Sequence, residues 1–188
     1  MKYLIGLLAV LTPALGLAHS GHDNIVMSVS TISNSMTAGF LHPLLGLDHL
    51  LSLVAVGILA SRLNGKHRYL IPIGFVSLML IGFFTAHAGI HMVSTGSVEM
   101  LITLSLAVAA LLVLAGKLLQ VNNSFNVIFA WVLTTFASIH GMAHGLEVPA
   151  GASATMFALG FALACLTTIS VTIISTRLIA PVEHQQAS

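Results

Sequence analysis

The chain has 188 residues, of which 57% are hydrophobic and only 6% are charged, and its mean hydropathy is +1.03. These values lie far outside the range of soluble globular proteins and indicate an all-α, polytopic protein of the lipid bilayer. The formal net charge of +1 comes without a basic stripe, which excludes nucleic acid as an expected partner. The single cysteine, Cys165, excludes an internal disulfide and a thiolate-rich metal cage.

The first 18 residues have the pattern of a cleavable signal peptide. Lys2 supplies a positive charge, Leu4–Leu11 a short apolar run and Gly16-Leu17-Ala18 a small-x-small cleavage site. We therefore expect residues 1–18 to be removed and residues 19–188 to form a single transmembrane domain.

Cleavage after Ala18 would make His19 the first residue of the mature chain. Its α-amine and ring nitrogen could then chelate a metal ion together, with His22 close by. The N-terminus would in that case capture metal outside the membrane. A flexible, solvated tail explains the same two residues equally well.

Five hydrophobic segments follow a polar stretch and predict a transmembrane bundle of about five helices. They lie near residues 40–60, 69–88, 98–118, 126–145 and 153–177. Pro43 stands near the start of the first segment, where a missing N–H costs little, so we expect the helix proper to begin there.

The basic residues predict the orientation of this bundle. If the mature N-terminus lies outside and the chain crosses the membrane five times, all Lys and Arg residues of the mature chain lie on the same side. These are Arg62, Lys66, Arg68, Lys117 and Arg177. Because Lys and Arg collect in cytoplasmic segments, that side is expected to be the cytoplasm. The predicted location is the inner membrane of a bacterium, with a periplasmic mature N-terminus and a cytoplasmic C-terminus.

Ten histidines against five carboxylates are the unusual feature of the composition. A histidine inside a bilayer is costly unless it faces a partner, a cavity or a metal ion. The predicted topology places two histidines in the outer half of each of three spans, and Asp48, Glu99 and Glu147 lie at the same level. Glu99 is explained equally by capping of the third helix, because a carboxylate is favourable near a helix N-terminus, so the candidate ligands include only the other two carboxylates. The candidate ligands are His42, Asp48, His49, His87, His91, His140, His144 and Glu147.

Helical spacing decides which of these side chains can act together, because residues three, four or seven apart share a face. His42 and His49 are seven apart, the other two pairs are four apart, and Glu147 is three beyond His144. Imidazole is a ligand for nickel, cobalt, zinc, copper and iron, and a carboxylate can complete the site or orient a ring. One such histidine is more often a packing residue, but six at one depth favour a metal site.

Two eight-residue segments resemble signatures of a known family. His42–His49 reads HPLLGLDH and is similar to HPxxGxDH, and His140–Glu147 reads HGMAHGLE and is similar to HGxAHGxE. Both patterns belong to the HupE/UreJ family of nickel and cobalt permeases. The resemblance implies that the ligands are His42, Asp48, His49, His140, His144 and Glu147, whereas His87 and His91 are added on position alone. The family is usually drawn with six or more mature spans, and only five are evident here.

The resemblance implies an uptake permease rather than an enzyme, with Ni²⁺ the first expected substrate and Co²⁺ the second. No permanently bound cofactor is expected, and the partners are the metal ion and membrane lipid. Self-association and transfer of the ion to nickel or cobalt metallochaperones remain open. The hydroxyls of the last span, such as Thr167 and Ser170, offer weaker ligands through which the ion could leave.

Two other classes of protein fit parts of the pattern. An intramembrane zinc hydrolase would use three His and Asp ligands to hold an activated water, and it would need a cleft open to the substrate. A haem-binding electron-transfer protein would use histidines of two helices as axial ligands. Haem binding would leave the carboxylates without a role.

Overall fold

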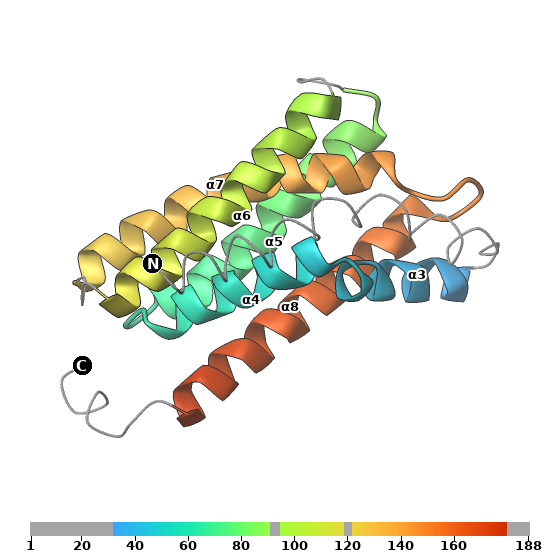
Figure 1. Cartoon of the computed structure of the whole chain (residues 1–188). Coiled ribbons are helices and arrows are strands. Elements are labelled where there is room, and N and C mark those ends of the chain that lie inside the picture. Colours follow the sequence, from blue (N-terminus) through green and yellow to red (C-terminus); the bar gives the residue numbers. More distant parts are fainter. Residues whose placement is uncertain (1–31, 91–94, 119–121, 180–188) are drawn as a thin grey trace.

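The computed structural model describes residues 32–90, 95–118 and 122–179, and every regular element in these ranges is a helix (Figure 1). The helices are α3 (Ile32–Leu45), α4 (Leu47–Ser61), α5 (His67–His87), α6 (Thr95–Leu118), α7 (Asn123–Leu146) and α8 (Ala154–Ile179). The predicted all-α class is therefore confirmed. The last four predicted segments coincide with α5 to α8 to within three residues at each end. The predicted signal peptide, residues 1–18, lies outside the described residues.

The prediction of one helix over residues 40–60 was wrong, because the chain bends by 78° between α3 and α4. Pro43 lies in the last turn of α3 rather than at a helix start, and it has no N–H to continue the hydrogen-bond ladder. Gly46 then adopts an extended conformation, with φ −81° and ψ 114°. The next ladder starts at its carbonyl, which accepts a hydrogen bond of 2.9 Å from the N–H of Leu50.

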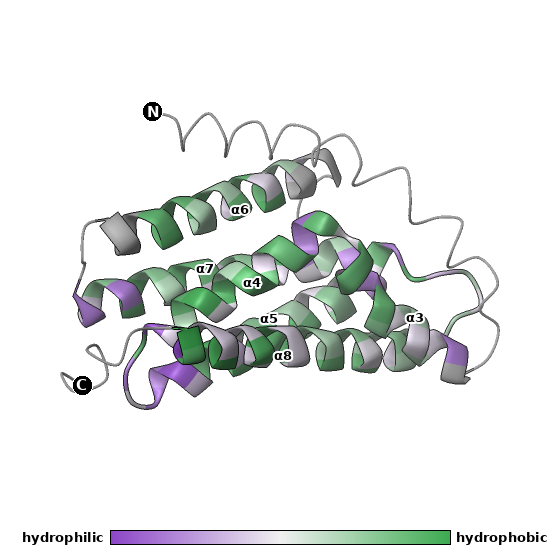
Figure 2. Ribbon diagram, turned by 60° about the horizontal axis from the view of Figure 1, so that its bottom comes forward, coloured by the Kyte–Doolittle hydropathy of each residue, from purple (hydrophilic) through white to green (hydrophobic). Residues whose placement is uncertain are grey.

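Three of the described helices, α5, α7 and α8, are each long and apolar enough to cross a membrane. The bent pair α3 and α4 meets the same test only when it is taken together, and α6 contributes a shorter apolar stretch, Met100–Leu114. Hydrophobic residues cover most of the length of the helices (Figure 2). These features are those of a helical membrane protein, while the count of five spans stays a prediction.

Glycine allows two pairs of helices to approach closely. Between α5 and α7, a methyl group on Gly82 would overlap the carbonyl of Ser138, and one on Gly141 would overlap the carbonyl of Met79. Between α3 and α8, Gly39 lies in the same way against the carbonyl of Phe157. Lipid tails are as apolar as leucine, so close backbone packing is a main source of attraction between helices in a bilayer. These contacts fix α7 and α8 beside the bend.

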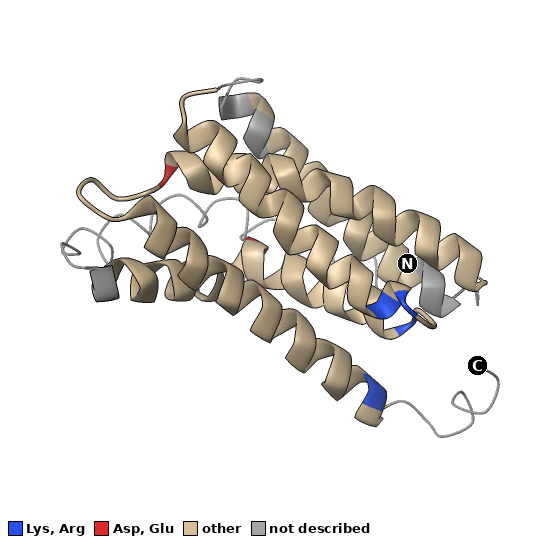
Figure 3. Cartoon of the chain, turned by 180° about the vertical axis from the view of Figure 1, so that it is seen from behind, with Lys and Arg blue, Asp and Glu red and all other residues tan. Residues whose placement is uncertain are grey.

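The Lys and Arg residues whose side chains the structure describes lie at one end of the bundle, and the two carboxylates whose side chains it describes, Asp48 and Glu147, lie away from it (Figure 3). At the basic end, Arg62 donates a hydrogen bond of 3.0 Å from Nη1 to the carbonyl of Val113 in α6. Arg177 donates from Nε and Nη2 to the carbonyl of Ser61 at 3.3 and 3.2 Å. The guanidinium group of Arg177 thus meets the carbonyl end of α4, where a positive charge is favourable.

Replacement of Gly82 by alanine is expected to destabilise the bundle, because the new methyl group has no room beside the Ser138 carbonyl. Overpacking of this kind costs about 1–3 kcal/mol. The matched control on the same helix is Gly74→Ala, whose methyl group would meet only side-chain atoms of Trp131 and Thr134 at 3.2–3.5 Å. Size-exclusion chromatography of heated, detergent-solubilised protein measures the difference. Equal stability of the two variants would contradict the packing described here.

Candidate metal centre

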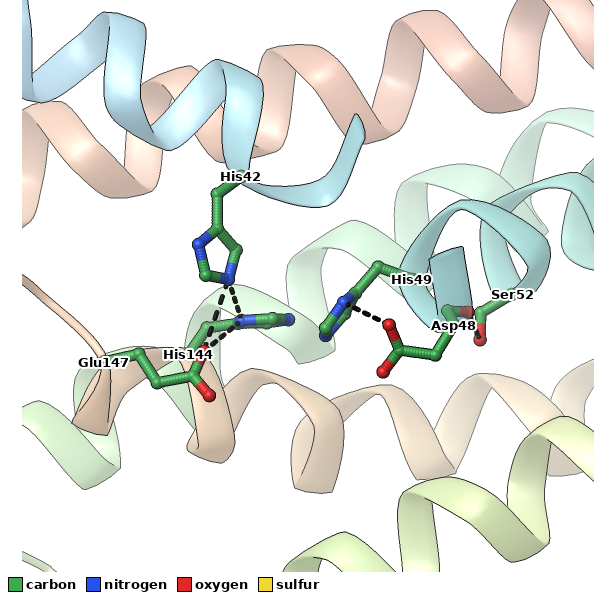
Figure 4. Close-up of polar contacts among 6 residues, drawn as sticks. All are labelled: His42, Asp48, His49, Ser52, His144 and Glu147. Atoms are coloured by element: carbon green, nitrogen blue, oxygen red, sulfur yellow. Dashed lines mark hydrogen bonds and ion pairs between the residues drawn. The ribbon is translucent and has the colours of Figure 1, made fainter. Parts of the chain in front are cut away.

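Four histidines meet inside the bundle, beside the bend between α3 and α4, and Figure 4 shows three of them, His42, His49 and His144. His42 comes from the end of α3 and His49 from the first turn of α4, while His140 and His144 come from the last two turns of α7. His144 is at the centre, and its ring is completely buried. Because the chain bends between α3 and α4, His42 and His49 can approach the ring of His144 from different sides.

The first group of possible ligands contains His42, His144 and Glu147. The distance from His42 Nε2 to His144 Nδ1 is 2.9 Å, and Glu147 Oε2 lies 3.1 Å from the latter atom and 3.2 Å from the former. Ligands about 2.1 Å from a metal ion and at right angles to each other are about 3.0 Å apart. These three atoms could therefore occupy three neighbouring coordination positions of an octahedral or tetragonal metal ion without moving closer to one another.

The second group contains His49, His140 and His144, whose ligand atoms lie within 4.8 Å of one another. The ring centroids are 4.7 Å apart for His49 and His140 and 4.4 Å apart for His49 and His144. Nε2 of His144 is buried and has no hydrogen-bond partner among the described residues. A buried polar atom without a partner loses the free energy of its hydration, so its position indicates a place for a metal ion or a water.

Asp48 lies beside this second group. Its Oδ1 is 3.0 Å from Nδ1 of His49, but the two atoms are not aligned as a hydrogen bond, so the contact is chiefly electrostatic. The backbone carbonyl of Asp48 accepts a hydrogen bond of 2.9 Å from the Ser52 hydroxyl. A carboxylate in this position can orient an imidazole and make it a better ligand.

Two phenylalanines of α8 form an apolar wall that the sequence analysis did not predict. The ring of Phe161 lies 4.6 Å from that of His144, and the ring of Phe157 lies 5.5 Å from that of His42. Both phenylalanines are buried. They exclude water from one side of the histidines, which strengthens electrostatic interactions there. Their spacing of four residues on an apolar helix does not differ from that of lipid-facing residues, so the sequence alone carries no signal for them.

The remaining predicted ligands do not join the centre within the described residues. His87 is exposed at the end of α5, where its ring stacks on Phe83 at 6.1 Å, and it belongs to neither group of ligand atoms. His19, His22 and His91 lie outside the described residues. By contrast, all six residues of the two sequence motifs lie together.

The family profile "HupE / UreJ protein" matches residues 7–187, which is almost the whole chain. The chain belongs to this family. It is also 33% identical over 160 residues to "Protein HupE" of Rhizobium leguminosarum bv. viciae, a match that covers 85% of this chain and 75% of the relative. No solved structure matches the chain significantly.

Membership of the HupE/UreJ family identifies the chain as a membrane transporter for metal uptake and not an enzyme. The alternative of an intramembrane zinc hydrolase was therefore wrong. The same membership counts against a haem-binding electron-transfer protein.

Proposed function

We propose that the chain is an inner-membrane permease that takes up a divalent transition-metal ion, Ni²⁺ first and Co²⁺ second. The observation that carries this proposal is the convergence of both sequence motifs on one buried centre. The ligands would be His42, His49, His140, His144 and Glu147, with Asp48 orienting His49. The ion is the substrate, and no resident cofactor is part of the proposal.

The charges of the centre favour a divalent ion. Among the described side chains, Asp48 and Glu147 are the two carboxylates beside the four histidines, and each makes a close contact with an imidazole nitrogen. Neutral imidazoles and two carboxylates carry a charge of about −2, which a divalent cation neutralises. Buried charges without such compensation are costly in a bilayer. The ion therefore completes the centre electrostatically as well as by coordination.

The donor set suits both nickel and cobalt. The described ligand atoms are imidazole nitrogens and carboxylate oxygens, and sites of this kind bind divalent ions with affinity that rises from Co to Ni. The sulfurs of Met79 and Cys165 lie 4.0 Å from each other in the apolar core and belong to neither group of ligand atoms. Thioether and thiolate ligands would instead suit Cu(I).

Uptake is expected to depend on the buried histidines. In cells that express the chain, His49→Ala and His144→Ala should each lower saturable uptake of radioactive Ni²⁺ or Co²⁺ at least roughly tenfold, since even second-shell partners contribute roughly 10–100-fold to metal affinity. The control is His67→Ala, because His67 begins α5 at the basic end. Full uptake by His144→Ala, at an equal amount of membrane protein, would refute the proposed ion path.

The orientation of the bundle follows from its basic end, which we propose faces the cytoplasm. Because α8 runs from the histidine end to the basic end, the C-terminus would then be cytoplasmic and the metal centre would lie in the periplasmic half. Alkaline phosphatase fused to the C-terminus is expected to be inactive, and a fluorescent protein fused there is expected to fluoresce. An active phosphatase fusion would show that the orientation is inverted.

A further inference from the structure

We propose that the centre binds the transported ion at two successive positions that share His144. The outer position is formed by His42, His144 and Glu147, and the inner position by His49, His140 and His144. The inference rests on the proposed permease function, and it adds the number of positions, their order and the number of ions that they can hold.

The two positions use opposite nitrogens of the same ring. Nδ1 of His144 lies 2.9 Å from His42 Nε2 and 3.1 Å from Glu147 Oε2, so it belongs to the outer position. The other nitrogen, Nε2, points toward His49 (Figure 4) and has no hydrogen-bond partner among the described residues. One buried side chain thus faces both groups of ligands.

This sharing limits the centre to one ion at a time. A neutral imidazole has one nitrogen that can bind a metal and one that carries a proton. His144 can therefore serve the outer or the inner position, but not both together. Two divalent ions on either side of this one buried ring would also repel each other. When an ion leaves Nδ1 of His144, that nitrogen can take up a proton while Nε2 loses its own, so Nε2 becomes available as a ligand for the inner position.

Depth along α7 gives the order of the two positions. Glu147 follows the last residue of α7 and its side chain is 51% exposed, whereas His140 is buried. Seven helical residues separate them, which corresponds to about 10 Å. An ion arriving from the histidine end therefore meets Glu147 and the outer position first, and it reaches His140 only after passing His144.

The charges of the ligands indicate unequal affinities. The outer ligand atoms are 2.9–3.2 Å apart and include a carboxylate oxygen of Glu147, whereas the inner group consists of three imidazoles. A carboxylate attracts a divalent cation more strongly than a neutral imidazole does, so binding at the inner position is weaker. A site that is filled easily, followed by one that holds its ion less tightly, favours release on the far side.

The inner position also adjoins a cavity that leads away from the centre. Ser52, Ser105 and His140 supply the polar side chains of this cavity, which lies between α4, α6 and α7. Of the hydroxyl-bearing residues of α8 that were expected from the sequence to line the exit, Thr167 and Ser170 are exposed, whereas the side chain of Thr172 packs against Gly57 of α4. From His140, the inferred inward path continues into the cavity.

Binding of Co²⁺ to the purified full-length protein in detergent tests the two positions, since its visible absorption depends on coordination geometry. The variants are Glu147→Gln and His42→Gln for the outer position, His140→Gln and His49→Gln for the inner one, and His144→Gln for both. Every protein in the series, the reference included, carries His19→Gln and His22→Gln, which removes metal binding by the N-terminal histidines.

The reference protein, with its centre unchanged, is expected to bind one Co²⁺ per chain. Each outer variant should still bind one Co²⁺, at least tenfold more weakly than the reference protein and with a changed absorption spectrum. Each inner variant should bind one Co²⁺ with the spectrum of the reference protein. His144→Gln should bind no Co²⁺.

Two results would overturn the inference. Binding of two Co²⁺ ions by the reference protein would show that the positions do not exclude each other. Loss of all binding in an outer and an inner variant alike, with the folding of each checked by size-exclusion chromatography, would show one undivided site. In both cases the wild type still binds and transports the ion. A wild type that neither binds Co²⁺ nor takes it up would instead refute the proposed function itself.

Discussion

Pro43 has no N–H to donate and Gly46 has an extended backbone, so the helical hydrogen bonds stop between α3 and α4 and the chain turns by 78°. In a continuous helix, His42 and His49 would lie about 10 Å apart along one face. After the bend their ring centroids are 5.8 Å apart, and they approach His144 from two sides. Gly46 is required at this point because a side chain there would overlap Nδ1 of His49.

The packing around the bend gives the centre its chemical properties. Gly82, Gly141 and Gly145 bring α5 and α7 into backbone contact and so hold the last turns of α7 in place. Phe157 and Phe161 close the side formed by α8. Imidazoles in such surroundings have little water to solvate a charge, so a divalent ion together with Asp48 and Glu147 is the arrangement that leaves the fewest charges uncompensated. The helix packing that holds the fold together therefore also determines the surroundings of the histidines.

The sequence predicted much of this arrangement, since hydropathy located α5 to α8 and two motifs gave the residues that meet at the centre. It did not predict the bend, because the hydrophobic pattern continues across Gly46 and Pro43 is equally compatible with a helix start. It also placed His87 at the right depth but not in the centre. Spacing gives the angle between residues of one helix, whereas the rotation of that helix depends on its neighbours. Gly82 faces α7, and His87, five residues later, points about 140° away from it.

The central claim is that the ion binds to buried imidazoles beside the bend, and X-ray absorption at the nickel edge of the Ni²⁺-loaded protein tests it most directly. The account predicts nitrogen and oxygen neighbours at about 2.1 Å, with the outer-shell scattering of at least two imidazoles, and loss of that imidazole scattering in His144→Ala. A spectrum of hydrated nickel, or one with sulfur neighbours at about 2.3 Å from Met79 and Cys165, would contradict it.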